Sequence, residues 1–301
     1  MIKIYHCEHK EKVSELEEFK VGVWIDVVNP SDEEIEKVVA MLGVEESLLR
    51  DALDPFEVPR LESEEDITYV YARVPKNSNS GIFTVPLLFA IGKDFVLTFS
   101  KVECGFFDNI RSGKKSVCTT QKANFFMQVF SLINISYLGY LNGINKKIRA
   151  MKVRLEHINN KDILQFVDFE YVLNDFLSAL VPINSVLQKL LDGKHIKLYE
   201  EDEDLVEDVL LSNGQLIETA KATLTHATNI RNAYSNIMTH DLNRVMKILT
   251  ALTILLTIPT MIFSFYGMNV SLPSSSYFGV MIFTIVISIL VFMVFLKKRW
   301  F

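Results

Sequence analysis

Two long apolar tracts without charge lie near the C-terminus and constrain the fold of this chain more than any other feature. They run from Ile248 to Tyr266 and from Tyr277 to Leu296. A helix needs about 20 residues to cross about 30 Å of hydrocarbon, and each tract is close to that length. A buried helix of a soluble protein would normally keep a charged edge. We therefore expect two transmembrane helices within residues 248–301, joined by a short external loop and followed by a basic C-terminus.

The charges beside these tracts predict their orientation. Arg244 and Lys247 precede the first tract, and Lys297, Lys298 and Arg299 follow the second, whereas the connection 267–276 carries no charge. Positively charged residues are retained on the cytoplasmic side of a membrane. We expect a multi-pass protein of the cell inner membrane, with both its N- and C-termini in the cytoplasm.

Composition excludes several other classes of protein. The hydrophobic share of 49% and the mean hydropathy of +0.21 are too high for a disordered chain. Lys and Arg total 31 against 37 Asp and Glu, so the overall charge of −6 disfavours nucleic acid as a partner. Three cysteines fit no disulfide framework, which indicates a reducing compartment.

The residues before the membrane divide by pattern into two predicted domains. Residues 1–115 predict a cytoplasmic α/β domain with β-branched or alternating runs at 21–28, 67–74, 82–91 and 95–99, a helix that opens at 29–34, and a turn at 77–81. Residues 116–247 predict a cytoplasmic helical domain with helices over 122–159 and 162–191. Its last helix, from about residue 203, is expected to form a stalk that continues into the membrane.

Small polar residues recur along the first apolar tract and just before it. Steps of three and four place them on one helix face, which we call the polar stripe: Asn243, Thr250, Thr253, Thr257, Thr260 and Ser264, with Met246 completing the series. One interpretation is close helix packing, with threonine hydroxyls bonded to carbonyls four residues earlier. The other is that several copies of this helix surround a water-filled path, which requires a ring of subunits.

The outer end of the polar stripe carries the sequence Tyr266-Gly267-Met268-Asn269. With this motif between two terminal spans, the chain resembles the CorA Mg²⁺ channels, whose signature is Gly-Met-Asn after an aromatic residue. The resemblance is strongest over 242–269 and again at 297–300. It implies an α+β membrane protein in which the α/β domain, the long helices and the two spans assemble as a funnel-shaped homopentamer.

The resemblance also implies roles for individual residues. Gly267, Met268 and Asn269 would form the selectivity filter, the polar stripe would line the pore, and Met246 with Leu249 would form a hydrophobic gate. Mg²⁺ keeps several bound waters, so a ring of Asn269 amides can bind those waters without stripping them. Gly267 is expected to permit the turn that ends the helix, and Pro259 to free a carbonyl. Unlike many members, this chain has no acidic pair in the loop 271–276.

An acidic run at 200–208 lies near the start of the expected stalk. It could be a solvated helix face. The resemblance implies instead that Asp208 binds regulatory Mg²⁺ between subunits and favours the closed channel. Asp202, Asp204 and Glu207 are further candidate ligands by proximity alone. The partner carboxylate expected near 77–80 is missing.

These observations predict a divalent-cation channel that carries Mg²⁺ into the cytoplasm down its electrochemical gradient and is gated by cytoplasmic Mg²⁺. Mg²⁺ is then both the transported and the regulatory ion, and the partners are further copies of the chain, the lipid bilayer and hydrated divalent cations. The alternative is a transporter of Zn²⁺, Co²⁺ or Ni²⁺. A non-conducting ion sensor is disfavoured by the polar stripe, and an anchored enzyme by the lack of catalytic motifs.

Overall fold

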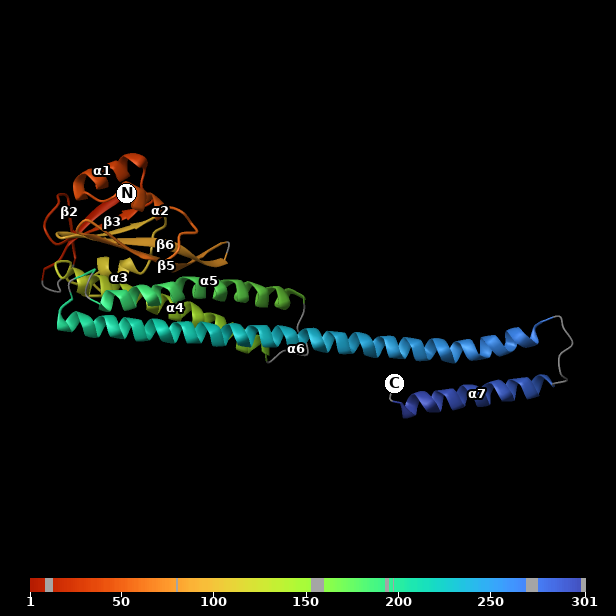
Figure 1. Cartoon of the computed structure of the whole chain (residues 1–301). Coiled ribbons are helices and arrows are strands. Elements are labelled where there is room, and N and C mark those ends of the chain that lie inside the picture. Colours follow the sequence, from red (N-terminus) through yellow and green to blue (C-terminus); the bar gives the residue numbers. More distant parts are fainter. Residues whose placement is uncertain are drawn as a thin grey trace. The chain divides into compact units, whose positions relative to one another are not determined.

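The computed structural model describes residues 1–8, 13–79, 81–152, 160–192, 195–196, 198–268 and 276–298. The chain forms two compact units, Met1–Asn229 and Ile230–Phe301 (Figure 1). The first unit holds a sheet and most of the helical residues, and the second holds the apolar C-terminal segments. One long helix, α6 (Glu200–Tyr266), belongs to both units.

A mixed seven-stranded sheet forms the centre of the first unit, with strand order β2-β1-β3-β7-β6-β5-β4. Among the strands in the described part of the chain, only β3 and β7 pair in parallel, with Val23 opposite Phe95. The four strand regions expected from sequence are confirmed as β3, β5, β6 and β7. The strands span Ile2–His6 (β1), Ser14–Leu16 (β2), Val23–Val28 (β3), Leu61–Glu64 (β4), Ile67–Ser78 (β5), Gly81–Ile91 (β6) and Phe95–Ser100 (β7).

Local sequence signals explain where the first helix begins and ends. Helix α1 (Asp32–Leu42) opens with a capping box, because the Ser31 hydroxyl accepts from Glu34 N–H and the Glu34 carboxylate accepts from Ser31 N–H. It ends at Gly43, whose φ of 66° is open to glycine at little steric cost. Two shorter helices follow, α2 (Glu46–Asp51) and α3 (Phe107–Arg111).

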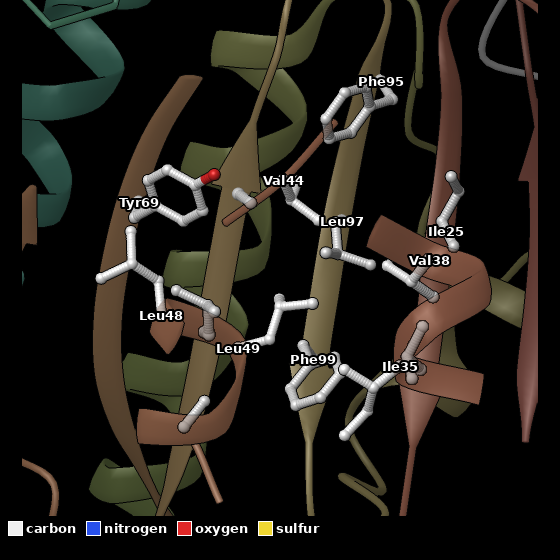
Figure 2. Packing of buried hydrophobic residues seen from close by; sticks show 14 of the residues in the cluster. Ile25, Ile35, Val38, Val44, Leu48, Leu49, Tyr69, Phe95, Leu97 and Phe99 are labelled. Carbon is white, nitrogen blue, oxygen red and sulfur yellow. The ribbon is translucent and has the colours of Figure 1, made fainter. Parts of the chain in front are cut away.

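Helices α1 and α2 cover one face of the sheet (Figure 1). Figure 2 shows their apolar side chains Ile35, Val38 and Leu49 against Leu97 and Phe99 of β7, and all five are buried. Two tyrosines of β5 add polar contacts, since the hydroxyl of Tyr69 accepts from Glu45 N–H and that of Tyr71 donates to Leu48 O. The fixed position of α2 therefore depends on β5 as well as on apolar burial.

Three long helices lie on the opposite face of the sheet: α4 (Lys122–Lys152), α5 (Asn160–Leu191) and the first part of α6. The aromatic ring of Phe89 on β6 packs edge-on against Phe126 of α4, with ring centroids 4.9 Å apart. Buried amides set the register between helices, because Asn134 Nδ2 donates to Val209 O and Asn213 Nδ2 to Leu180 O. Each amide would lose its partner if one helix slid along another.

The second unit contains the rest of α6 and helix α7 (Tyr277–Lys297). Both helices are long and apolar enough to cross a membrane, with mean hydropathy of 2.1 and 2.9 over their most apolar windows. Both predicted spans are thus helical, and the first continues from the stalk without a break. Few of their side chains are buried within the unit, so most of both helices is available to lipid or to further protein chains.

Candidate ion pathway along α6

Helix α7 packs on one side of α6 and leaves the polar stripe uncovered. Ala251 is fully buried, and Leu255, Pro259 and Ile262 are half-buried on the same face. Thr250, Thr253, Thr257, Thr260 and Ser264 are all exposed. At about 100° per residue, the centres of these two faces are about 180° apart around the helix axis. The structure thus turns the hydroxyl groups away from α7.

The threonine hydroxyls of the stripe all bond to their own helix. Those of Thr250, Thr253, Thr257 and Thr260 donate to the carbonyl oxygens of the residues four positions earlier, at 2.8, 2.9, 2.7 and 2.8 Å. This is the bonding expected from the close-packing interpretation. Each bond uses the single hydrogen of the hydroxyl and leaves its oxygen lone pairs as acceptors. The exposed face consequently offers acceptors, which suit the water molecules around a cation.

The residues proposed for the hydrophobic gate lie before the first threonine of the stripe, Thr250. Met246 is 53% exposed and Leu249 is 55% exposed, and Asn243 is exposed one turn earlier. A single chain therefore does not close a constriction at this level. Their apolar side chains can do so only against other chains around a common axis.

The expected filter begins where α6 ends. Gly267 N–H donates to Phe263 O at 2.9 Å, so helical bonding continues one residue beyond Tyr266. Gly267 forms the turn directly after α6, and its φ is not positive, so this turn does not use the left-handed conformation open to glycine. A Cβ at this position would lie 3.3 Å from Phe263 O, a tight contact. Gly267 and Met268 are exposed, whereas Asn269 and the loop 271–275 lie outside the described residues.

Pro259 lies on the α7 side of α6, and its ring nitrogen carries no hydrogen. The carbonyl that loses its intrahelical donor is that of Leu255, four residues earlier. Leu255 also lies on the α7 side. The carbonyl freed by the proline therefore belongs to the contact between the helices, on the side away from the polar stripe.

The acidic run separates into structural and solvent-facing residues. Asp202 is 7% exposed, and its carboxylate accepts from Tyr199 N–H at 3.2 Å at the start of α6. Asp204, Glu207 and Asp208 are exposed. Within the described ranges, no three His, Cys, Asp or Glu side chains converge on a point that could hold a metal ion. A regulatory ion at these carboxylates would need ligands from a second chain.

Comparison with known proteins fits this arrangement. Residues 19–299 match the profile of the family described as CorA-like Mg²⁺ transporter protein. The chain belongs to this family. The family is one of transporters, so the chain is not an enzyme, and its two C-terminal apolar helices are transmembrane helices.

Individual relatives cover nearly the whole chain. The "Cobalt/magnesium transport protein CorA" of Methanocaldococcus jannaschii is 27% identical over 293 residues, covering 92% of this chain and 91% of the relative. The protein of the same name from Thermotoga maritima is 21% identical and covers 96% of this chain and 86% of its own. The complete structure of the Methanocaldococcus jannaschii transporter superposes with a TM-score of 0.85 at 21% identity, covering 99% of this chain and 96% of that one. This last likeness confirms the fold.

Proposed function

We propose that this chain forms a homopentameric channel that carries Mg²⁺ into the cytoplasm. The observation that supports this proposal most directly is the exposed row of hydroxyl oxygens on the face of α6 opposite α7. Hydroxyls that face lipid gain nothing over apolar side chains, so this face has a use only against water or protein. Two spanning helices per chain cannot enclose a pore, and a symmetric ring of copies can. The number five comes from the resemblance to CorA channels.

The chemistry of the polar stripe favours a hydrated cation. Mg²⁺ loses its waters reluctantly, and those waters donate hydrogen bonds. The back-bonded threonines supply acceptors without a fixed negative charge, so an ion can bind and still leave. An inside-negative potential adds about 4.6 kcal/mol per 100 mV for a doubly charged ion, so inward flow needs no other energy source.

The resemblance assigns the remaining roles. Gly267, Met268 and Asn269 form the filter at the outer end, and Met246 with Leu249 closes the path by excluding water. Cytoplasmic Mg²⁺ bound by Asp208 and by its neighbours Asp204 and Glu207, which proximity alone adds, together with groups of a neighbouring subunit, favours the closed ring. The solvent exposure of all three carboxylates supports this last role, because a bridging ion needs ligands that reach beyond their own chain. We place both termini in the cytoplasm.

A second candidate cargo is another divalent metal, Co²⁺, Ni²⁺ or Zn²⁺. The curated relatives of this chain carry cobalt as well as magnesium in their names. Influx into liposomes that contain a Mg²⁺-sensitive dye, with each ion added as competitor, distinguishes the cargoes. Saturable Mg²⁺ influx that rises with an inside-negative potential is the expected result. Influx of Zn²⁺ or Co²⁺ without Mg²⁺ influx would show that the cargo is one of these metals and not Mg²⁺. No influx of any ion would refute the channel.

A further inference from the structure

A pocket of about 410 Å³ lies between α6 and α7 in the membrane-spanning unit. Its exposed surface is wholly apolar, although two of the α7 residues that line it, Thr284 and Ser288, carry hydroxyl groups. Leu255 and Pro259 of α6 lie across the pocket from them. A pocket of this kind in hydrocarbon has no bulk water to satisfy polar groups, so the partners of its hydroxyls matter.

The two hydroxyls of α7 differ in their bonding. Thr284 Oγ1 donates to Val280 O at 2.8 Å, as the stripe threonines of α6 do with their own helix. Ser288 Oγ is buried and has no hydrogen-bond partner among the described residues. Ser288 thus holds a donor that no acceptor of the described residues uses, and the residue lines the pocket opposite α6.

The matching acceptor lies on α6. The carbonyl of Leu255 points along the helix toward residue 259, where proline supplies no N–H. Leu255, Pro259 and Ser288 all line the same pocket. The pocket surface itself is apolar, and the two residues lie on its opposite walls: Leu255 carries a carbonyl without its intrahelical donor, and Ser288 carries a buried hydroxyl without an acceptor.

We propose that the Ser288 hydroxyl donates to the Leu255 main-chain oxygen and fastens α7 to the face of α6 opposite the polar stripe. Ser288 is then a positioning residue, because the side on which α7 is held decides which side of α6 stays free for ions. The bond forms when the two helices close on the pocket by a side-chain rotation and a small approach. The hydrogen bond depends on the helical hairpin alone, whereas the positioning role rests on the proposed ion path along α6.

The size of the effect follows from measured hydrogen bonds between membrane helices. On average, losing such a bond changes the equilibrium constant of unfolding by about threefold. Replacing Pro259 by Ala restores an N–H for the Leu255 carbonyl. The Leu255 carbonyl is then hydrogen-bonded within α6, and the Ser288 hydroxyl adds less to the stability of the helix pair.

A double-mutant cycle on the full-length protein tests this coupling. The proteins are the parent, Ser288→Ala, Pro259→Ala and the double variant, with unfolding followed in mixed detergent–SDS micelles. Ser288→Ala should raise the equilibrium constant of unfolding about threefold in the parent background and leave it nearly unchanged in the Pro259→Ala background. Ser288→Thr keeps a hydroxyl and should restore most of the loss. Thr284→Val is the matched control, because it removes a hydroxyl that its own helix already satisfies, and it should cost less than Ser288→Ala.

Two results would overturn the proposal. One is an equal loss from Ser288→Ala with and without Pro259, which would mean that the hydroxyl and the proline act independently. The other is an equal loss of stability from Ser288→Ala and Thr284→Val in the parent, which would mean that Ser288 contributes only by filling space between the helices. The comparison of Ser288→Ala, Ser288→Thr and Thr284→Val alone decides the matter if the Pro259→Ala protein does not fold.

Discussion

Thr257 donates its hydroxyl hydrogen to the main-chain oxygen of Thr253, 2.7 Å away and one turn earlier on the polar stripe of α6. The bond holds the Thr257 oxygen in place with its lone pairs available to the exposed side of the helix. A fixed acceptor can receive a hydrogen bond from a water of a passing ion without first reorienting. The bonding that suits close helix packing thus also suits an ion path.

We expect Thr257→Val to reduce Mg²⁺ influx, because valine has the shape of threonine without the oxygen. A hydrogen bond to a charged group is worth about 1.5 kcal/mol, which corresponds to about a tenfold fall in influx. Thr257→Ser keeps the oxygen and should stay close to the parent. Dye-loaded liposomes with equal amounts of assembled protein provide the measurement, and equal influx by the valine and serine variants would remove Thr257 from the path.

We expect the combined change of Met246 and Leu249 to Gly to raise the resting leak. The two side chains are exposed on each chain and would meet across the axis of a ring, where an apolar constriction excludes water. Glycine also costs about 1 kcal/mol of helix stability per position. The combined change of Leu252 and Leu256 to Gly, at two exposed positions off the stripe, controls for that cost. A leak at the parent's level in the double variant, measured with enough Mg²⁺ inside the liposome to hold the parent closed, would move the gate elsewhere.

The sequence predicted the long helices and the central strands well because their patterns are strong. It did not predict β4 and α2, and the reason is local. Strand β4 reads Leu-Glu-Ser-Glu and lies at the sheet edge, so its polar side chains need not alternate with buried ones. Helix α2 has six residues and is held by Tyr69 and Tyr71 of a strand far along the chain. Such contacts leave no signal in the segment itself.

For the candidate ion pathway, the sequence predicted some features and missed others. Periodicity alone placed the threonines of the stripe on one face, since a helix repeats every 3.6 residues. It could not tell which face α7 would cover, because α7 is apolar all round. Pro259 was expected to free a carbonyl, but only packing assigns the Leu255 carbonyl to the α7 side. Asp202 looked like its acidic neighbours in sequence, and its burial distinguishes it.

We expect Asn269→Ala to abolish Mg²⁺ selectivity or transport while the oligomer stays assembled. Asn269 follows the last turn of α6 in the sequence, and an amide oxygen there can accept from the waters of Mg²⁺. Alanine removes that acceptor from every subunit of a ring. The checks are Mg²⁺ influx with Co²⁺ and Ni²⁺ as competitors, and size-exclusion chromatography for assembly. Influx and competition identical to the parent's would show that the filter lies elsewhere.

We expect Arg111→Met to destabilise the sheet domain in a pH-dependent way. The Arg111 guanidinium pairs with Asp26 of β3, whose side chain is 3% exposed. Burial raises the pKa of Asp26 above its usual value, so the folded state favours the protonated form relative to the unfolded chain. Without Arg111 the ionised carboxylate has no cation beside it, and the loss of stability should be about 3 kcal/mol at pH 7.

The sign of the pH effect follows from that raised pKa. Below the unfolded-state pKa, Asp26 is neutral in both states and needs no cation, so the loss should shrink as the pH falls from 7 through the folded-state pKa. Thermal unfolding of the detergent-solubilised full chain at several pH values measures it. Lys114→Met, which removes an exposed cation nearby, should lower Tm little at any pH. A deficit for Arg111→Met that does not change with pH would show that Asp26 stays ionised without its partner.

We expect the combined change of Asp204, Glu207 and Asp208 to Ala to make Mg²⁺ influx less sensitive to Mg²⁺ inside the liposome. The three carboxylates are exposed near the start of α6, and a divalent ion gains most when carboxylates of two chains reach it or its waters. The segment 77–80 has only neutral side chains, so inhibition should be weaker than in relatives with a complete acidic pair there.

A charge-matched variant separates specific binding from the loss of negative charge. Glu18, Glu33 and Glu36 are exposed acids elsewhere in the first unit, and changing all three to Ala alters the net charge equally. The stalk variant should need several-fold more internal Mg²⁺ for half inhibition, and its cytoplasmic part should be cut faster by protease when Mg²⁺ is present, because no bridging ion holds neighbouring chains together. The charge-matched variant should follow the parent in both measurements. Superimposable inhibition curves for all three proteins would make the acidic run a solvated helix face and place the sensor elsewhere.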